Sequence, residues 1–339
     1  MKLLLHSRFW PSVGGIETVA ELLAREWVKQ SVVVTIVTDI ARPIERNSFP
    51  FPVHYQPRLS VFLNLLRKHD VVVHFNVSLR AIWPLLIVRR PFIAAHHGFY
   101  VIDESGKRDW REKLKLFVAK HGTENIAVSE SVARTIGIPC KIIANPFSPE
   151  AFHKSEERVK TRDLVFLGRL VSSKGVNVLI QALALLENSG LKPHLTIIGD
   201  GPERGALEKL ARDVGVESQV SFTGTIPTEK VATLLFEHKI LVVPSIWNEG
   251  FGVVALEGIA SGCVVIGSDS GGLPEAIGKC GLVVRTGDAE ALAGAMKRAL
   301  TEPDLITELR SNAADHLTRH SPACVAERYL TVISQALLR

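Results

Sequence analysis

The stretch that decides the fold is Pro244–Glu257, with the sequence PSIWNEGFGVVALE. It follows the short apolar run Ile240–Val243 and continues into an apolar helical pattern. A buried strand, a glycine-containing loop and a helix, in that order, are typical of one unit of a parallel α/β sheet. Gly250 and Gly252 allow the backbone of this loop to approach a polar ligand closely. The stretch therefore predicts a ligand-binding loop at the carboxyl end of a strand.

Two carboxylates accompany this loop. Glu249 lies within it, and Glu257 lies in the first turns of the predicted helix. A carboxylate on a helix beside a phosphate site can accept hydrogen bonds from both hydroxyls of a ribose. For either glutamate alone, a helix-start carboxylate favoured by the helix dipole is an equally good interpretation.

The same strand–loop–helix pattern extends in both directions along the chain. Short apolar runs predict strands at Lys2–His6, Val32–Thr38, Asp70–Phe75, Phe92–His96, Asn125–Val128, Cys140–Ala144, Asp163–Leu167, His194–Ile198, Val220–Phe222, Ile240–Val243, Val264–Gly267 and Gly281–Val284. Helical patterns separate them, which predicts an α/β fold of two Rossmann-like, doubly wound parallel-sheet domains facing across a cleft. Proline breaks near 146–149 and a charged stretch at 154–162 divide the chain. We expect domains at 1–155 and 156–320, and a C-terminal helix at 321–339 that could pack back on the first domain.

Other loops of the second half repeat this arrangement. Arg169 and Lys174 follow the predicted strand Asp163–Leu167 within one loop. An arginine fork and a lysine point charge could together neutralise a diphosphate, although two solvated surface cations are the alternative. Glycines also follow three further strands, in GDGP at 199–202, FTGTIP at 222–227 and SGGLPE at 270–275. Chance explains one such loop more easily than the whole set.

In the first half, Gly14 and Gly15 come after the first strand and open a helix. The free N–H groups at a helix N-terminus can receive a phosphate, although a tight turn also favours glycine. The sequence here is not the G-x-G-x-x-G of dinucleotide enzymes, which argues against a dehydrogenase.

Charge and composition narrow the class of protein. The 339 residues carry 40 Lys and Arg against 35 Asp and Glu, a net charge of +5. Residues 1–150 have a net charge of +7 and residues 151–339 of −2. This asymmetry suggests nucleic acid, a phosphorylated ligand or a membrane surface as partner of the first half, or simply solubilising charge.

The 4 cysteines are scattered, which argues against a zinc site or a disulfide scaffold. With no apolar run of about 18 residues and no signal-peptide pattern, we expect a cytoplasmic protein.

Residues 162–290 closely resemble the C-terminal domain of the family-4 (group 1) glycosyltransferases, retaining enzymes of the GT-B fold. The matching segments are FLGRLVSSKGVNVLIQAL, LTIIGDGPE, VSFTGTIP, VVPSIWNEGFGVVALEGIASG and SGGLPEAIG. Glu249 and Glu257, separated by seven residues, match the E-x7-E pair of that family.

The resemblance implies a role for each matching residue. Arg169 and Lys174 would bind the diphosphate of a nucleotide-sugar donor, Glu257 the ribose, and Glu249 hydroxyls of the transferred sugar. The loop backbone would contact sugar and phosphate at Gly250, Phe251, Gly252, Val253 and Val254, and Thr225 and Ile226 would border the nucleobase.

The resemblance of the first half is weaker. Gly14 and Gly15 match a glycine loop that meets the diphosphate. AAHHG at 94–98 matches a segment whose histidine sits at the reacting centre, which makes His97 the better candidate. Ala95 departs from the threonine common there, the adjacent His96 is a second candidate, and a purely structural imidazole remains an alternative.

The implied function is a retaining glycosyltransferase that moves a hexose-type sugar, from UDP rather than GDP, to a glycan or lipid-linked acceptor in polysaccharide or glycolipid synthesis. We expect no metal and no other cofactor, because the sequence contains no D-x-D pair.

A basic helical segment at 107–118 places Trp110, Leu114, Phe117 and Val118 on one face. It could lie on anionic lipid at the inner face of the membrane, or its apolar face could be core. A sugar-nucleotide epimerase and a non-catalytic nucleotide-sugar-binding protein are alternatives. A nucleic-acid-binding protein is disfavoured because no recognised motif is present.

Overall fold

The computed structural model describes residues 1–11, 14–44, 47–100, 109–152 and 160–338. The chain forms two compact units, which are described separately. Unit 1 comprises Met1–Phe147 and His320–Arg339, and unit 2 comprises Ser148–Arg319.

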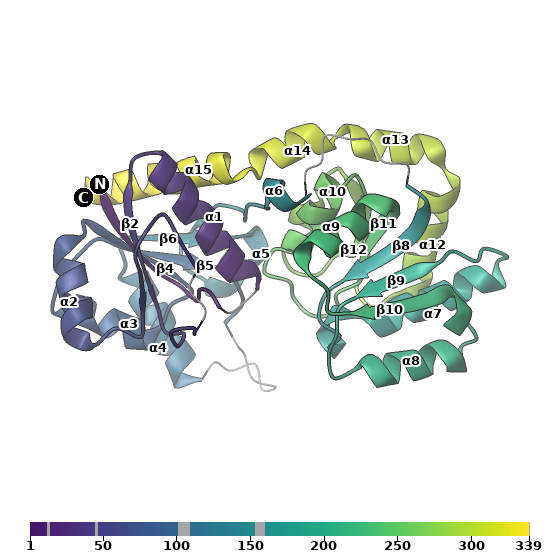
Figure 1. The fold of residues 1–339 in the computed structure, drawn as a ribbon, viewed down its shortest axis with the longest axis horizontal. Coiled ribbons are helices and arrows are strands. Elements are labelled where there is room, and N and C mark those ends of the chain that lie inside the picture. Colours follow the sequence, from purple (N-terminus) through teal and green to yellow (C-terminus); the bar gives the residue numbers. More distant parts are fainter. Residues whose placement is uncertain (12–13, 45–46, 101–108, 153–159, 339) are drawn as a thin grey trace. The chain divides into compact units, whose positions relative to one another are not determined.

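Unit 1 contains a seven-stranded parallel sheet in the order β3-β2-β1-β4-β5-β6-β7 (Figure 1). Its strands are β1 (Lys2–His6), β2 (Val33–Thr38), β3 (Val53–Tyr55), β4 (Val71–Phe75), β5 (Phe92–His96), β6 (Glu124–Ala127) and β7 (Lys141–Ile142). The order runs outward from β1 in both directions, as in a doubly wound sheet. The edge strand β3 was not predicted from the sequence; it has only three residues, all half-buried.

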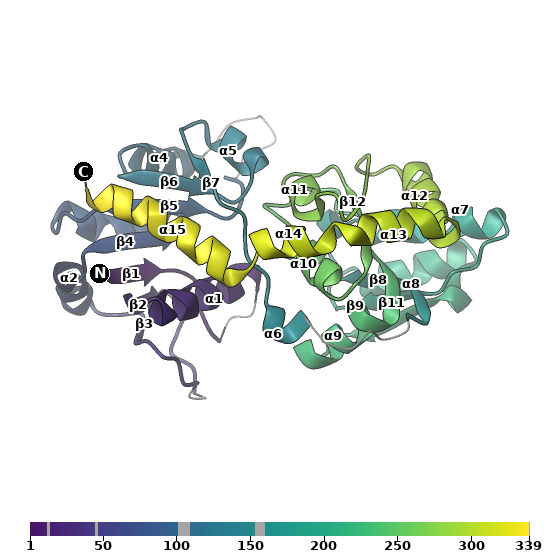
Figure 2. The ribbon, with the colours of Figure 1, turned by 90° about the horizontal axis from the view of Figure 1, so that it is seen from above.

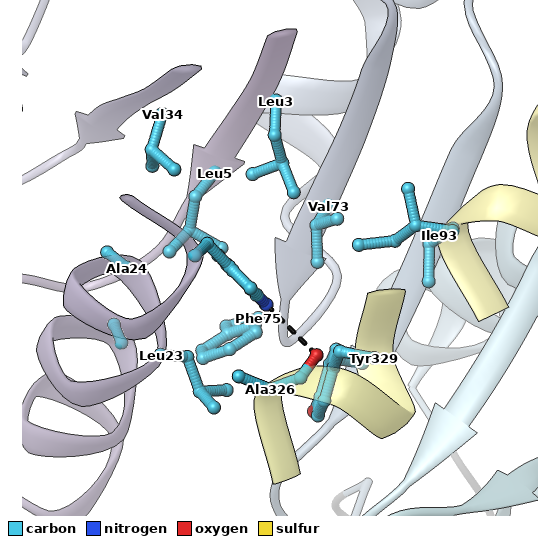
Figure 3. Close-up of a cluster of buried hydrophobic side chains, with 14 of the residues drawn as sticks. Leu3, Leu5, Leu23, Ala24, Val34, Val73, Phe75, Ile93, Ala326 and Tyr329 are labelled. Atoms are coloured by element: carbon cyan, nitrogen blue, oxygen red, sulfur yellow. Dashed lines mark hydrogen bonds between the residues drawn. The ribbon is translucent and has the colours of Figure 1, made fainter. Parts of the chain in front are cut away.

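The helices of unit 1 are α1 (Gly15–Lys29), α2 (Leu59–Lys68), α3 (Leu79–Ile82), α4 (Trp110–Lys120), α5 (Glu130–Ile136) and α15 (Pro322–Leu337), with a 3₁₀ turn η1 (Trp83–Leu86). Figure 2 shows α15 lying over the strands beside α1. The core between them is apolar and includes Leu23, Ala326 and Tyr329 (Figure 3). Within it, the buried Trp27 donates from Nε1 to the carbonyl oxygen of Ala326 at 3.2 Å. This contact joins residues 299 positions apart.

Unit 2 contains a six-stranded parallel sheet in the order β10-β9-β8-β11-β12-β13. Its strands are β8 (Arg162–Leu167), β9 (Leu195–Ile198), β10 (Val220–Gly224), β11 (His238–Val243), β12 (Val264–Ser268) and β13 (Gly281–Val284). The chain order reverses between β8 and β11. Ligands of open parallel sheets bind at such a reversal, outside the carboxyl ends of the strands.

The helices of unit 2 are α6 (Pro149–Phe152), α7 (Val176–Asn188), α8 (Arg204–Asp213), α9 (Thr228–Glu237), α10 (Val253–Ala260), α11 (Leu273–Ile277), α12 (Ala289–Thr301), α13 (Pro303–Ser311) and α14 (Ala313–Arg319), with 3₁₀ turns η2 (Ser172–Lys174) and η3 (Glu217–Gln219). The prediction of two doubly wound parallel sheets is confirmed. Within the described ranges, no helix combines the length and apolarity needed to cross a bilayer.

Candidate functional site

The loops that follow β8 and β11 meet through charged side chains. Lys174 donates from Nζ to Oε1 of Glu249, and Ser245 donates from Oγ to the same carboxylate oxygen at 2.8 Å. Lys174 and Glu249 are both half-buried. The structure thus brings together two of the residues that the sequence singled out, at the point where the strand order reverses.

The backbones of these two loops are in direct contact at Gly175. This residue has φ +68°, and an added Cβ would lie 2.0 Å from the carbonyl oxygen of Pro244. Beside it, the backbone N–H of Ile246 donates to the carbonyl oxygen of Ser173 at 3.0 Å. Only glycine permits both this conformation and this approach. The glycine therefore fixes the position of Lys174 relative to the Glu249 loop.

The Glu249 loop is held on its other side by the loop after β12. Gly271 has φ +62°, and an added Cβ would lie 2.1 Å from the carbonyl oxygen of Glu249. The N–H of Gly272 donates to that same oxygen at 2.8 Å. Backbone contacts on two sides therefore preorganise the carboxylate of Glu249 before any ligand binds.

Glu257 lies in the second turn of α10, whose N-cap is Gly252. Its side chain is half-buried, and burial raises the pKa of its carboxyl to about 7. Among the described residues, no side chain or backbone group forms a hydrogen bond with this carboxylate. Hydroxyls of a ligand that donate to it would stabilise its ionised form.

The remaining predicted residues of unit 2 lie in loops at the same edge of the sheet. Arg169 is exposed directly after β8, whereas Thr225 and Ile226 follow β10, two strands away. None of these three, nor Glu257, forms a hydrogen bond or ion pair with Lys174 or Glu249. In the loop that leads into α10, Phe251 is buried, and Gly250, Gly252, Val253 and Val254 are half-buried. The side chain of Phe251 faces the interior, so only its backbone is available to a ligand.

In unit 1, His97 follows β5 directly. Its Nδ1 lies 3.0 Å from Oδ1 of Asn145, and its backbone N–H donates to Oδ1 of Asn76 at 2.8 Å. An amide oxygen only accepts, so Nδ1 carries the proton in this arrangement. Nε2 is buried without a hydrogen-bond partner among the described residues. Burial lowers the pKa of this imidazole to about 3, so His97 presents a neutral acceptor nitrogen at physiological pH.

The adjacent His96 is different. Its Nδ1 lies 2.6 Å from the hydroxyl of Tyr100, and its Nε2 lies 3.0 Å from Oδ1 of Asn125. Burial lowers the pKa of His96 to about 4. Because both ring nitrogens are already bonded, this imidazole is a structural group, and the geometry favours His97 as the functional one.

Asn76 and Asn145 position His97, and neither was predicted from the sequence as a functional residue. Asn76 follows β4 and has φ +57°, a conformation that asparagine tolerates better than most residues. Its place immediately after a strand was the available signal. Asn145 offered no comparable signal, because its partner lies 48 residues away in the sequence.

Gly14 and Gly15 begin α1 of unit 1. Gly14 is the N-cap in an extended conformation, and no side chain caps the helix. No described atom lies within 4 Å of the position of an added Cβ at Gly15. At Gly14, in contrast, an added Cβ would lie 2.7 Å from Oε2 of Glu17, so the start of α1 leaves space beside Gly15 only.

Two doubly wound parallel sheets, each with polar groups at the carboxyl edge, define a two-domain α/β protein of the doubly wound class. The family model "Glycosyl transferases group 1" matches residues 147–316, and the model "Glycosyltransferase Family 4" matches residues 13–143. The chain belongs to the group 1 glycosyltransferase family.

Named relatives are similar in sequence to part of this chain. A D-inositol 3-phosphate glycosyltransferase of Corynebacterium aurimucosum is 33% identical over 185 residues, which is 52% of this chain and 44% of the relative. A GDP-mannose-dependent alpha-(1-6)-phosphatidylinositol monomannoside mannosyltransferase of Mycolicibacterium smegmatis is 35% identical over 166 residues, covering 46% and 44%. The match thus spans less than half the length of these relatives.

Solved structures share the whole fold. HepE of Anabaena in complex with UDP superimposes with a TM-score of 0.81 at 18% identity and covers 99% of this chain and 100% of that one. Sucrose-phosphate synthase of Thermosynechococcus elongatus gives a TM-score of 0.76 at 20% identity, with 98% of each chain covered. The predicted GT-B fold is confirmed.

Proposed function

We propose that this protein is a retaining glycosyltransferase that moves a hexose-type sugar from a nucleotide diphosphate to a hydroxyl of a glycan or lipid-linked acceptor. The observation that carries the proposal is the contact of Lys174 and Ser245 with Glu249, between loops fixed by glycine at the strand-order reversal of unit 2. Family membership supports the same activity.

In this proposal, the donor lies along the carboxyl edge of the unit 2 sheet. Breaking the bond from the anomeric carbon leaves negative charge on the diphosphate, which Arg169 and Lys174 stabilise. Glu249 accepts hydrogen bonds from the transferred sugar, and Glu257 from the ribose. Backbone groups of 250–254 contact sugar and phosphate, and Thr225 and Ile226 border the base. The start of α1 at Gly14 and Gly15 contributes N–H groups to the diphosphate.

His97 acts on the sugar in this proposal. Its buried Nε2 is a neutral acceptor, which suits a sugar hydroxyl better than a phosphate oxygen. Asn145 holds the proton on Nδ1 and thereby keeps Nε2 unprotonated. Asn76 holds the backbone of the same residue.

Transfer proceeds without a metal ion or another cofactor in this proposal. Two cationic side chains supply the positive charge that a divalent ion supplies in other enzymes. Within the described ranges, no group of three or more His, Cys, Asp or Glu side chains is arranged as a metal site. Addition of a chelator should leave activity unchanged, and loss of activity that magnesium restores would contradict this point.

We favour a UDP-sugar as donor. Neighbouring structures of HepE contain UDP or UDP-glucose, which supports this choice, whereas the mannosyltransferase relative is named for GDP-mannose. A thermal-shift panel of UDP- and GDP-sugars tests the proposal with the wild type and K174A. A UDP-sugar should raise the Tm of the wild type more than that of the variant. If no nucleotide sugar stabilises the wild type, the proposed function is wrong.

The proposal also places the protein at the cytoplasmic face of an anionic membrane through α4. Trp110, Leu114 and Phe117 are 63%, 41% and 59% exposed on this helix. They recur at helical spacing, and the helix also carries Arg111, Lys113 and Lys120, a combination suited to an anionic lipid surface. Flotation with anionic vesicles should carry the wild type but not a W110A/F117A double variant. Failure of the wild type to float would remove this part of the proposal.

A further inference from the structure

The imidazole of His97 needs more than one hydrogen bond to hold a single orientation. Its Nδ1 lies 3.0 Å from Oδ1 of Asn145, which holds one edge of the ring. The torsion that turns a histidine ring about its Cβ–Cγ bond has broad minima, so a bond at one edge leaves the plane of the ring free to swing. A contact on the face of the ring is needed to give Nε2 one direction.

Phe75 makes this contact. Its ring centroid lies 4.3 Å from that of His97, with the two planes tilted by 43°. Phe75 is the last residue of β4 and is 3% exposed. The next residue, Asn76, accepts the backbone N–H of His97 at 2.8 Å. Two consecutive residues at the end of β4 therefore hold His97, one through its ring and one through its backbone.

The register of the sheet explains how Phe75 reaches this ring. Phe75 of β4 is paired with Ala95 of β5. Side chains alternate along a strand, so Ala95 and His97 lie on the same face of the sheet as Phe75. Ala95 is fully buried in the same apolar core as Phe75. The threonine common at this position in the family would add a hydroxyl and a methyl group there, whereas alanine leaves space for the phenyl ring.

Phe75 is supported in turn by the C-terminal helix. The ring of Tyr329 in α15 lies 6.1 Å from that of Phe75, and both belong to the core drawn in Figure 3. On its other side, Tyr329 packs against Trp27 of α1 at 5.9 Å. The hydroxyl of Tyr329 is buried and has no hydrogen-bond partner among the described residues. The contribution of Tyr329 to this packing therefore comes from its ring.

We propose that Phe75 is a positioning residue that fixes the plane of the His97 imidazole, and that Tyr329 extends this support to α15. The inference rests on the proposed function for the part that His97 plays in sugar transfer, whereas the packing does not depend on it. With the plane held by Phe75 and the proton held on Nδ1 by Asn145, Nε2 presents its lone pair in one direction. Such preorganisation spares the reaction a reorientation, so it favours kcat more than KM.

¹⁵N NMR of histidine-labelled protein tests the positioning, because the shifts of the two ring nitrogens report which of them carries the proton. The signals that disappear in H97Q are those of His97. In the wild type, His97 should be entirely in the Nδ1–H form. In F75L and F75A, the ring can swing away from Asn145, and the two neutral tautomers should coexist. If both variants keep the pure Nδ1–H form, or if the wild type is already a mixture, the inference is overturned.

Two control variants distinguish positioning from a general loss of core packing. F92L removes a phenyl ring that is 6% exposed and that packs against a different histidine, His74, at 5.2 Å. Y329F removes only the buried hydroxyl and keeps the ring. Both should leave His97 entirely in the Nδ1–H form. If F92L produces the same mixture as F75L, the effect is general to the core and the inference is overturned.

Kinetics separate this inference from the proposed function. F75L should lower kcat for sugar transfer about tenfold and leave KM within about twofold, because a catalytic group held slightly out of place lowers the rate. F92L and Y329F should transfer sugar as the wild type does. If the wild type transfers no sugar, the proposed function fails, and the NMR result alone decides whether Phe75 positions His97. If the wild type transfers sugar and F75L keeps its kcat, the inference is overturned.

Discussion

The two units share one topology but build their functional edges by different means. In unit 2, backbone segments pack against one another at Gly175 and Gly271, and these contacts preorganise Lys174 and Glu249. In unit 1, single buried side chains form the candidate site, as where Asn76 and Asn145 contact His97. A parallel sheet can therefore present a ligand edge either through loop backbones or through single side chains.

This difference determines which amino-acid substitutions each site can tolerate. A site built on backbone contacts depends on residues that admit no Cβ, so a methyl group damages geometry and stability together. A site built on side chains depends on which hydrogen bonds are satisfied, so a substitution changes protonation or chemistry while the sheet remains. Variants of each kind test whether the two sites differ in this way.

The largest expected effect comes from the charged pair of unit 2. K174A and E249Q should each lower kcat/KM for sugar transfer by about 10³, because removal of one preorganised group that stabilises transition-state charge costs roughly 10²–10³. The control is K192A, which removes an exposed ion pair with Glu187. Steady-state kinetics measures the effect. A loss of less than tenfold in both site variants would place the chemistry elsewhere.

The next effect concerns His97 and its neighbour. H97A should lower kcat about 10²-fold with a small change in stability, whereas H96A should lose about 2 kcal/mol of stability with its two hydrogen bonds. N145A should lower kcat about tenfold, and N145D should recover most of it, because a carboxylate also keeps the proton on Nδ1. Kinetics and urea unfolding are measured side by side. Equal kinetic losses in H96A and H97A would contradict the assignment.

Substitution at the glycine contacts should lower the free energy of unfolding. G175A should destabilise unit 2 by about 2–4 kcal/mol and weaken donor binding at least tenfold, because its Cβ meets the carbonyl oxygen of Pro244. The matched control is G190A, where φ is +85° but no atom lies within 4 Å of the added Cβ. It should cost about 1 kcal/mol and leave binding intact. Identical behaviour of the two variants would show that the loop contact is unimportant.

The last expected effect is a pH dependence of stability through Glu257, which disappears at low pH. Burial raises the pKa of its carboxyl in the folded protein to about 7, above the ordinary value of 4.5. Its contribution to stability is therefore fully present below pH 4.5 and lost as pH rises through 7. E257Q should be more stable than the wild type at pH 8 by about 3 kcal/mol, and the difference should vanish near pH 4.5.

Ligand binding should have the opposite pH trend. Ribose hydroxyls favour the ionised carboxylate, so affinity for a nucleotide sugar, whose diphosphate does not titrate in this range, should rise several-fold between pH 6 and pH 8 in the wild type. In E257Q, affinity should be lower and independent of pH over this range. Calorimetric titration at the two pH values measures both, and a pH-dependent E257Q would point to another titrating group.

The same contrast between the two units explains which features of the fold and the site could be predicted from the sequence. The sheets and the unit 2 loops were predictable, because apolar runs, glycines and Glu249 stand at fixed spacings in one continuous stretch. The edge strand β3 was missed, because three half-buried residues form no pattern. Asn145 was missed for a different reason. Its contact with His97 is made only by folding, across 48 positions of the sequence, and no local pattern encodes it.

The central claim is that the Lys174–Glu249 pair binds and activates a nucleotide sugar, and release of nucleoside diphosphate followed by ³¹P NMR tests it most directly. The wild type and K192A should release diphosphate from at least one nucleotide sugar, and E249Q at least a hundredfold more slowly. If no nucleotide sugar is cleaved, if E249Q cleaves it as fast as the wild type, or if the sugar changes while its diphosphate bond stays intact, the account is contradicted.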